Sequence, residues 1–154
     1  MVDKGLYQLL TQDSGVSALV GTNVFWILAP KASSFPLVVL DWVATSDTIA
    51  FQGDLGFRNG LLQVSCYASQ HYPSRQIAQA VRNLLKSYKG NLPDADATAV
   101  AGVLQTKDWT QVYEEGSVGF VYRAMLEFRI WFYDSSLPIT PLPNGPALVD
   151  GGNF

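Results

Sequence analysis

The chain has 154 residues, of which 15% are charged and 48% are hydrophobic. A formal net charge of −3 excludes the basic footprint of a protein that holds nucleic acid by counterion release. The low share of charge favours a subunit whose surface is partly covered by neighbours, and a single cysteine excludes an internal disulfide.

No run of residues reaches the ~20 apolar positions of a membrane span. The N-terminal stretch Met1–Gly15 lacks the long apolar core of a secretory signal. We therefore expect a protein that is made in the cytosol and stays there, or is assembled there into something larger.

The N-terminal stretch Asp3–Val20 predicts two short helices or one broken helix. Leucine and valine recur there at helical spacing, and the turn-forming residues Asp13–Gly15 interrupt the pattern. The apolar run Val24–Ala29, closed by a proline, is typical of a short strand because of its aromatic and β-branched residues. After a loop, Leu37–Thr45 alternates as a second strand, with Asp41 on its wetter face.

The middle of the chain predicts a loop, a strand and a helix. Ser46–Asn59 contains glycine and has no sustained period, so we expect a long loop or a distorted hairpin arm that serves as an interface. Gly60–Ser69 alternates again, with Cys66 on the core side. From Pro73 to Tyr88 apolar residues recur at helical spacing, which predicts the clearest helix of the chain. Its polar side chains are expected to turn outward: Arg75, Gln79, Arg82 and Lys86.

A hairpin of two long strands is predicted next. Thr98–Tyr113 predicts a strand with an irregularity near Thr106–Asp108, and Glu114–Gly116 predicts a tight turn. In the strand that follows, every even position from Phe120 to Phe132 is apolar, which predicts one buried face. The odd positions mix apolar and charged residues, so the second face is not simply solvated.

These elements predict an α+β fold with an antiparallel or mixed β-sheet and helices packed on one face. We expect one domain over residues 1–133. Residues 134–154 hold four of the eight prolines and only two charged residues, which excludes a helix or a central strand. We expect this proline-rich segment to form an extended C-terminal arm.

No set of residues in the sequence points to catalysis. The single histidine, His71, is expected in a loop or at a helix start rather than as a general base or metal ligand. A small-molecule-binding or enzymatic domain that uses His71, Cys66 and Tyr67 is kept as an alternative. Asp94 and Asp96 lack the further ligands of a calcium loop, so we predict neither a metal nor a cofactor.

The order of the segments resembles that of the tail-completion, or tail-terminator, proteins of long-tailed bacteriophages. The segments that carry this resemblance are LYQLLTQD, VSALVGTNVFWILAP, FPLVVLDWVA, LLQVSCYAS, SRQIAQAVRNLL and RAMLEFRIWFY. They extend over most of residues 3–133. The resemblance implies a structural virion protein of the tail or neck that joins head and tail, assembles in the host cytoplasm and has no enzyme activity.

The resemblance further implies a homohexameric ring that ends polymerisation of the tail tube. Its partners are then the tail tube protein and the head–tail connector or stopper protein, while DNA passes through the lumen without specific binding and no membrane is involved. Another neck or tail-tube subunit is the nearer alternative. The residues that we expect at interfaces lie on the second face of the last strand, in the middle loop and in the arm: Arg123, Glu127, Arg129, Trp131, Asp54, Phe57, Arg58, Leu142 and Phe154.

Overall fold

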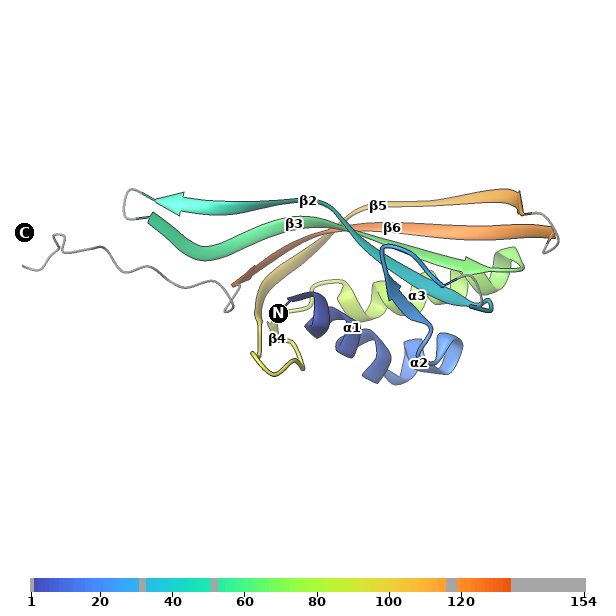
Figure 1. Cartoon of the computed structure of the whole chain (residues 1–154), viewed down its shortest axis with the longest axis horizontal. Helices are drawn as coiled ribbons and strands as arrows, with labels where there is room; N and C mark the ends of the chain where they lie inside the picture. The colour runs from blue at the N-terminus through green and yellow to red at the C-terminus, as the bar shows by residue number, and fades with distance from the viewer. Residues whose placement is uncertain (1, 31–32, 51–52, 116–118, 134–154) are drawn as a thin grey trace, which may run out of the picture.

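Residues 2–30, 33–50, 53–115 and 119–133 are described by the computed structural model, in which a long twisted sheet lies over three helices (Figure 1). The helices are α1 (Val2–Gln12), α2 (Ser14–Val20) and α3 (His71–Leu85). The strands are β1 (Val24–Trp26), β2 (Leu37–Ala50), β3 (Gly53–Ala68), β4 (Gly90–Asn91), β5 (Ala99–Glu115) and β6 (Gly119–Tyr133).

The strands are ordered β1-β2-β3-β6-β5-β4 across the sheet. Among the described strands, β1 pairs with β2 in parallel, and the other neighbouring pairs are antiparallel. Figure 1 shows all three helices on the same side of the sheet. The predicted α+β class with a mixed sheet is confirmed, whereas the expected arm at 134–154 lies outside the described residues.

Asp13 separates the two N-terminal helices, as the sequence predicts. Its carboxylate atom Oδ2 accepts a hydrogen bond from the backbone N–H of Val16 at 3.0 Å, which caps the first turn of α2. Gly21, with a φ of 60°, follows α2 and lets the chain leave the helix. Leu6 and Leu10 turn one face of α1 into the core beneath the sheet.

The prediction of a loop at Ser46–Asn59 is wrong, because β2 and β3 continue through that stretch as far as the pair Ala50 and Gly53. The alternative, a distorted hairpin arm, is confirmed. The register shifts at Val43, which is an extra residue in β2, and again after Asp47. The extra residue reverses which side chains face the helices, so the period of two is broken although the backbone stays paired.

Strand β6 lies between β3 and β5, and its even-numbered side chains form the centre of the core. The fully buried members of this set are Ala124, Leu126, Phe128, Ile130 and Phe132. The prediction fails at Phe120, which is 61% exposed. His71, the first residue of α3, contacts the ring of Tyr122, so Phe120 lies beyond the start of the helix that covers this face.

Two elements are shorter than predicted. Helix α3 buries Ile77, Val81 and Leu85 at helical spacing but ends at Leu85 rather than Tyr88, because the backbone of Lys86 is extended (ψ 120°). Strand β1 ends at Trp26, before the predicted boundary.

Gly5 brings α1 close to the segment that follows β4. A Cβ atom added at Gly5 would lie 2.8 Å from Cβ of Leu92 and 3.2 Å from Cγ of Asp94. The carboxylate of Asp94 is itself held, because the backbone N–H and the Oγ1 hydroxyl of Thr98 donate to its two oxygens at 2.9 and 2.8 Å. There is therefore no room for a side chain at this helix position.

We predict that Gly5→Ala destabilises the protein, although alanine is the better helix former. The clash with Leu92 forces a backbone shift, with an expected cost of about 1–3 kcal/mol in the free energy of unfolding. Gly102→Ala is the matched control, because a Cβ there meets nothing within 4 Å. Denaturant unfolding measures both variants, and an unchanged or raised midpoint for Gly5→Ala would contradict the close packing of α1.

Candidate interaction surface

No helix among the described residues covers the side of the sheet opposite α1, α2 and α3 (Figure 1). We call this side the uncovered face. The register places on it one residue in two from each long strand, and a polar row crosses its middle. That row consists of Asp41, Gln63, Glu127 and Lys107 from four adjacent strands. The row carries two acidic groups and one basic group, so the centre of the face is polar and has little net charge.

Arg123 is held on the uncovered face by its own neighbours. Its Nε and Nη2 atoms donate to Oγ of Ser65 at 3.2 and 3.1 Å, and Nη1 donates to Oε1 of Gln111 at 3.4 Å. Its guanidinium carbon lies 5.6 Å from the ring centroid of Tyr67, within the range of a cation–π contact. None of these partners is a carboxylate, so they orient the charge without neutralising it.

Glu127 and Arg129 lie further along β6 on the same face. The Oγ1 hydroxyl of Thr106 donates to Oε2 of Glu127 at 2.8 Å, and Nη1 of Arg129 donates to Oδ1 of Asn59 at 2.6 Å. Thr106 is the extra residue at the register shift of β5, where the sequence predicts an irregularity. Trp131 follows along β6 on the same face and is half-buried. The predicted residues of β6 therefore share one face.

The other predicted interface residues divide between two faces or lie outside the described side chains. The ring of Phe57 contacts that of Tyr133 at the end of the uncovered face, with centroids 4.8 Å apart and the ring planes tilted by 48°. Arg58 points to the opposite side, where its Nη2 atom donates to Oγ1 of Thr45 at 3.1 Å. Asp54 lies in β3, but its side chain is outside the described part of the chain, as are the residues Leu142 and Phe154.

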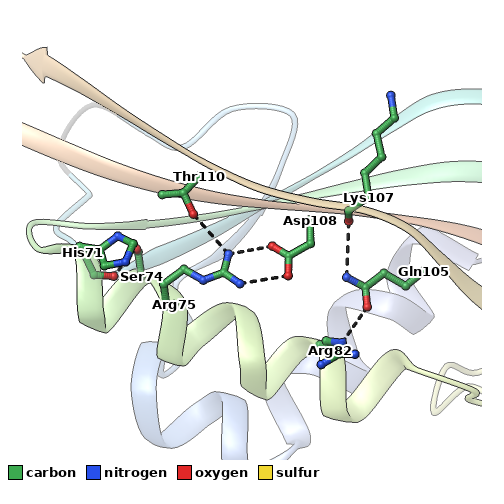
Figure 2. Close-up of polar contacts among 8 residues, drawn as sticks. All are labelled: His71, Ser74, Arg75, Arg82, Gln105, Lys107, Asp108 and Thr110. Atoms are coloured by element: carbon green, nitrogen blue, oxygen red, sulfur yellow. Dashed lines mark hydrogen bonds and ion pairs between the residues drawn. The ribbon is translucent and has the colours of Figure 1, made fainter.

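On the helix side, two arginines of α3 reach the edge strand β5, so the prediction that they turn outward is wrong (Figure 2). Arg75 donates to both carboxylate oxygens of Asp108 at 2.7 and 3.0 Å and to Thr110 at 3.3 Å. The Nε atom of Arg82 donates to Oε1 of Gln105 at 2.8 Å. The hydrogen-bonded Arg75 guanidinium holds the pKa of the Asp108 carboxyl below its usual range. These contacts attach β5 to α3 in the part of β5 whose helix-facing side chains are polar.

An apolar groove of about 310 Å³ lies at the other end of the uncovered face. It is bounded by the segment that follows β1 and by side chains of β2, β3 and β5, and its lining consists of Ile27, Leu28, Ala29, Pro30, Ser33, Phe35, Leu37, Val39, Tyr67 and Tyr113. The sequence does not predict this groove, because its walls come from four distant segments. Its one sequence signal is the apolar run that Pro30 closes.

Cys66, Tyr67 and His71 do not form a common site. Cys66 is buried beneath the sheet, and this burial raises the pKa of its thiol to about 12. Tyr67 points to the uncovered face, while His71 is exposed at the start of α3. The geometry therefore does not support the alternative of an enzymatic domain built on these three groups.

Within the ranges that the structure describes, no group of three or more His, Cys, Asp or Glu side chains is placed to hold a metal ion. No helix in the same ranges is long and apolar enough to cross a membrane.

Comparison with known proteins identifies a related family and a similar fold. The family model described as "Tail completion protein gp17" matches residues 4–133, which include nearly all of α1 and every later element through β6. A chain in the structure titled "Virion of native gene transfer agent (GTA) particle" superposes with a TM-score of 0.65 and 20% sequence identity. That alignment covers 82% of this chain and 90% of the other. Curated protein sequences show no significant match.

We predict that the thiol of Cys66 is inert in the folded protein. A buried thiol with a pKa of about 12 carries almost no thiolate near pH 8, and the core excludes the reagent. Labelling with 5,5′-dithiobis(2-nitrobenzoate) is expected to be undetectable in the native protein and complete in guanidinium chloride. Rapid labelling of the native chain would contradict the placement of Cys66 and reopen the enzymatic alternative.

Proposed function

This chain belongs to the tail completion protein gp17 family of phage tail structural proteins, and we propose that it is the tail terminator subunit of a long-tailed particle. In this proposal identical copies form a ring, six by resemblance to the family, at the head-proximal end of the tail. The ring ends polymerisation of the tail tube protein and joins the tail to the head–tail connector. The observation that carries the proposal is the family match over residues 4–133.

The exposed apolar side chains support assembly into a larger particle. Among the described residues, the large hydrophobic side chains with high exposure are Ile27, Leu28, Val43, Tyr72, Leu104, Val112, Tyr113, Phe120 and Tyr133. Several are grouped: three (Ile27, Leu28 and Tyr113) border the apolar groove, and two others, Val112 and Phe120, lie together near the end of the β5–β6 hairpin. Grouped apolar side chains at a surface are a mark of contact with other proteins.

The uncovered face is the proposed contact between subunits. Its charged groups, Arg123, Glu127 and Arg129, are already oriented by hydrogen bonds within the subunit, so little further ordering is required on binding. A near-neutral polar centre with aromatic residues at its ends suits a contact with a protein. The net charge of −3 is in keeping with a lumen through which DNA passes without specific binding.

The proposal assigns different tasks to the two parts of the chain. Residues 1–133 form the ring domain, and residues 134–154 form an arm that contacts another subunit or the adjoining ring through Leu142 and Phe154. No catalytic step is proposed, because Cys66 and Tyr67 lie on opposite sides of the sheet and His71 stands apart from both.

We predict that Arg129→Ala weakens ring formation without unfolding the subunit. Arg129 lies on the uncovered face and bonds to Asn59, so its loss is expected to change the free energy of unfolding by less than about 1 kcal/mol. Phe128→Asp, one position away, places an unpaired charge in the core and is expected to prevent folding. Circular dichroism reports the fold, and native mass spectrometry reports the number of copies.

The controls for this pair are direct. Lys4→Ala removes a cation from the exposed surface of α1 and is expected to leave both measurements unchanged. Wild-type chain that stays monomeric at all concentrations would refute the ring. Open-ended polymers of the wild-type chain would instead favour a tail-tube subunit, the nearer alternative.

We predict that truncation after Tyr133 leaves a folded subunit that assembles or joins poorly. Every core residue found in the described part of the chain lies between Val2 and Phe132, so the loss of residues 134–154 removes none of them. The fold is again followed by circular dichroism, and joining by the attachment of heads to tails in vitro. A truncated chain that forms rings and joins heads normally would show that the arm has no role.

A further inference from the structure

The apolar groove on the uncovered face is bordered by a strained turn that displays two large hydrophobic side chains. Ile27 has a φ of 71°, and the backbone N–H of Leu28 donates to the carbonyl of Trp26 at 2.7 Å. This three-residue turn with positive φ is rare, and it is especially unfavourable for a β-branched residue. The exposed fractions of Ile27 and Leu28 are 73% and 79%.

The surrounding structure maintains this strained turn. The backbone N–H of Ile27 donates to the carbonyl of Leu40 in β2 at 2.7 Å, which continues the pairing of β1 with β2 into the turn. Strained backbone that persists in this way tends to occur at binding sites. Its effect here is to hold two apolar side chains in solvent at the border of an apolar groove.

The lining of the groove fits a proline-rich peptide. Phe35, Tyr67 and Tyr113 supply aromatic rings, and Pro30 and Val39 supply aliphatic surface. Proline-rich segments in the extended polyproline conformation bind to aromatic-lined grooves of this kind, because their low conformational entropy reduces the cost of ordering.

The chain itself contains such a peptide. Within residues 134–154, two pairs of prolines have the spacing Pro-x-x-Pro, Pro138 with Pro141 and Pro143 with Pro146, and leucines and an isoleucine stand between and beside them. The segment has no basic residue and only two acidic ones, so burial of its proline-rich part requires little desolvation of charge.

The direction of β6 favours a neighbouring copy as the source of the peptide. Tyr133, the last residue of β6, pairs with Phe57, whereas Tyr67 in the groove pairs with Arg123. Ten residues of β3 separate those two pairs, which corresponds to about 33 Å. The chain leaves β6 while running away from its own groove, and its remaining 21 residues span up to about 65 Å in the polyproline conformation.

We propose that the groove lined by Phe35, Tyr67 and Tyr113 binds the proline-rich segment 137–146 of a neighbouring copy of the chain. This inference rests on the proposed ring, in which copies lie side by side. Each subunit then donates one segment and receives one, which is the head-to-tail type of contact that closes a ring.

Two full-length chains, each with one cysteine in addition to the native Cys66, test this directly. One carries Tyr113→Cys in the groove and the other carries Leu142→Cys in the segment, and the native thiol of Cys66 is buried and unreactive. The two chains are mixed, assembled, checked for the ring by native mass spectrometry and oxidised with diamide. We expect a disulfide-linked pair that contains one chain of each type.

The matched control replaces Tyr113→Cys with Val112→Cys. Val112 is exposed on the same strand but pairs with Tyr122 and faces the helix side. The groove position is expected to give at least about fivefold more cross-linked product, because a bound segment raises the local concentration of its thiol. Leu28→Cys, on the other border of the groove, repeats the test if Tyr113→Cys disturbs the fold.

The outcomes separate the two proposals. Intact rings with equal cross-linking at positions 113 and 112 would overturn the groove while leaving the proposed function in place. A chain that carries both Tyr113→Cys and Leu142→Cys and forms its disulfide internally, even when diluted with wild-type chain, would overturn the neighbouring source. Chains that remain monomeric would overturn the ring and, with it, this inference.

Discussion

The rest of the structure depends on the burial of the even-numbered side chains of β6 between the sheet and the helices. β6 is paired along both edges, and Phe128 and Phe132 lie at the centre of the core. Each large apolar side chain so buried contributes roughly 1.5–3 kcal/mol. A slip of one residue would place Arg129 in that core, so the register of β3 and β5 against β6 has little freedom. The charged residues of β6 are placed on the uncovered face as a direct consequence.

The outer strand β5 needs a second means of attachment, because its helix side becomes polar toward the β5–β6 hairpin. Arg75 and Arg82 provide it by bonding to Asp108 and Gln105, while the apolar side of α3 packs beneath β3 and β6. Thr106, the extra residue in β5, lies between these two contact points and bonds to Glu127 on the other face. The irregularity therefore serves both sides of the sheet.

This division of the sheet into a core face and an uncovered face accounts for the type of protein that the comparisons indicate. A tail completion protein must contact copies of itself or other parts of the particle, and a sheet with one face free of helices offers a broad surface for that purpose. On that surface Arg123 is oriented by Ser65 and Gln111 rather than paired with a carboxylate, so its charge stays available to a partner. The low share of charged residues in the chain is in keeping with the proposal that neighbouring subunits cover part of its surface.

The sequence by itself determined the α+β class, the break between α1 and α2 at Asp13, the β5–β6 hairpin and the two faces of β6. Each of these follows from local periodicity or from a turn residue. Only the tertiary structure decided the rest: the extension of β2 and β3 through Ser46–Asn59, the bond of Arg75 to Asp108 and the apolar groove around Tyr113. An extra residue such as Val43 removes the alternation on which prediction relies, yet pairing with the next strand still stabilises the backbone. The groove and the arginine contacts join segments far apart in the chain, and no local pattern specifies which of them will meet.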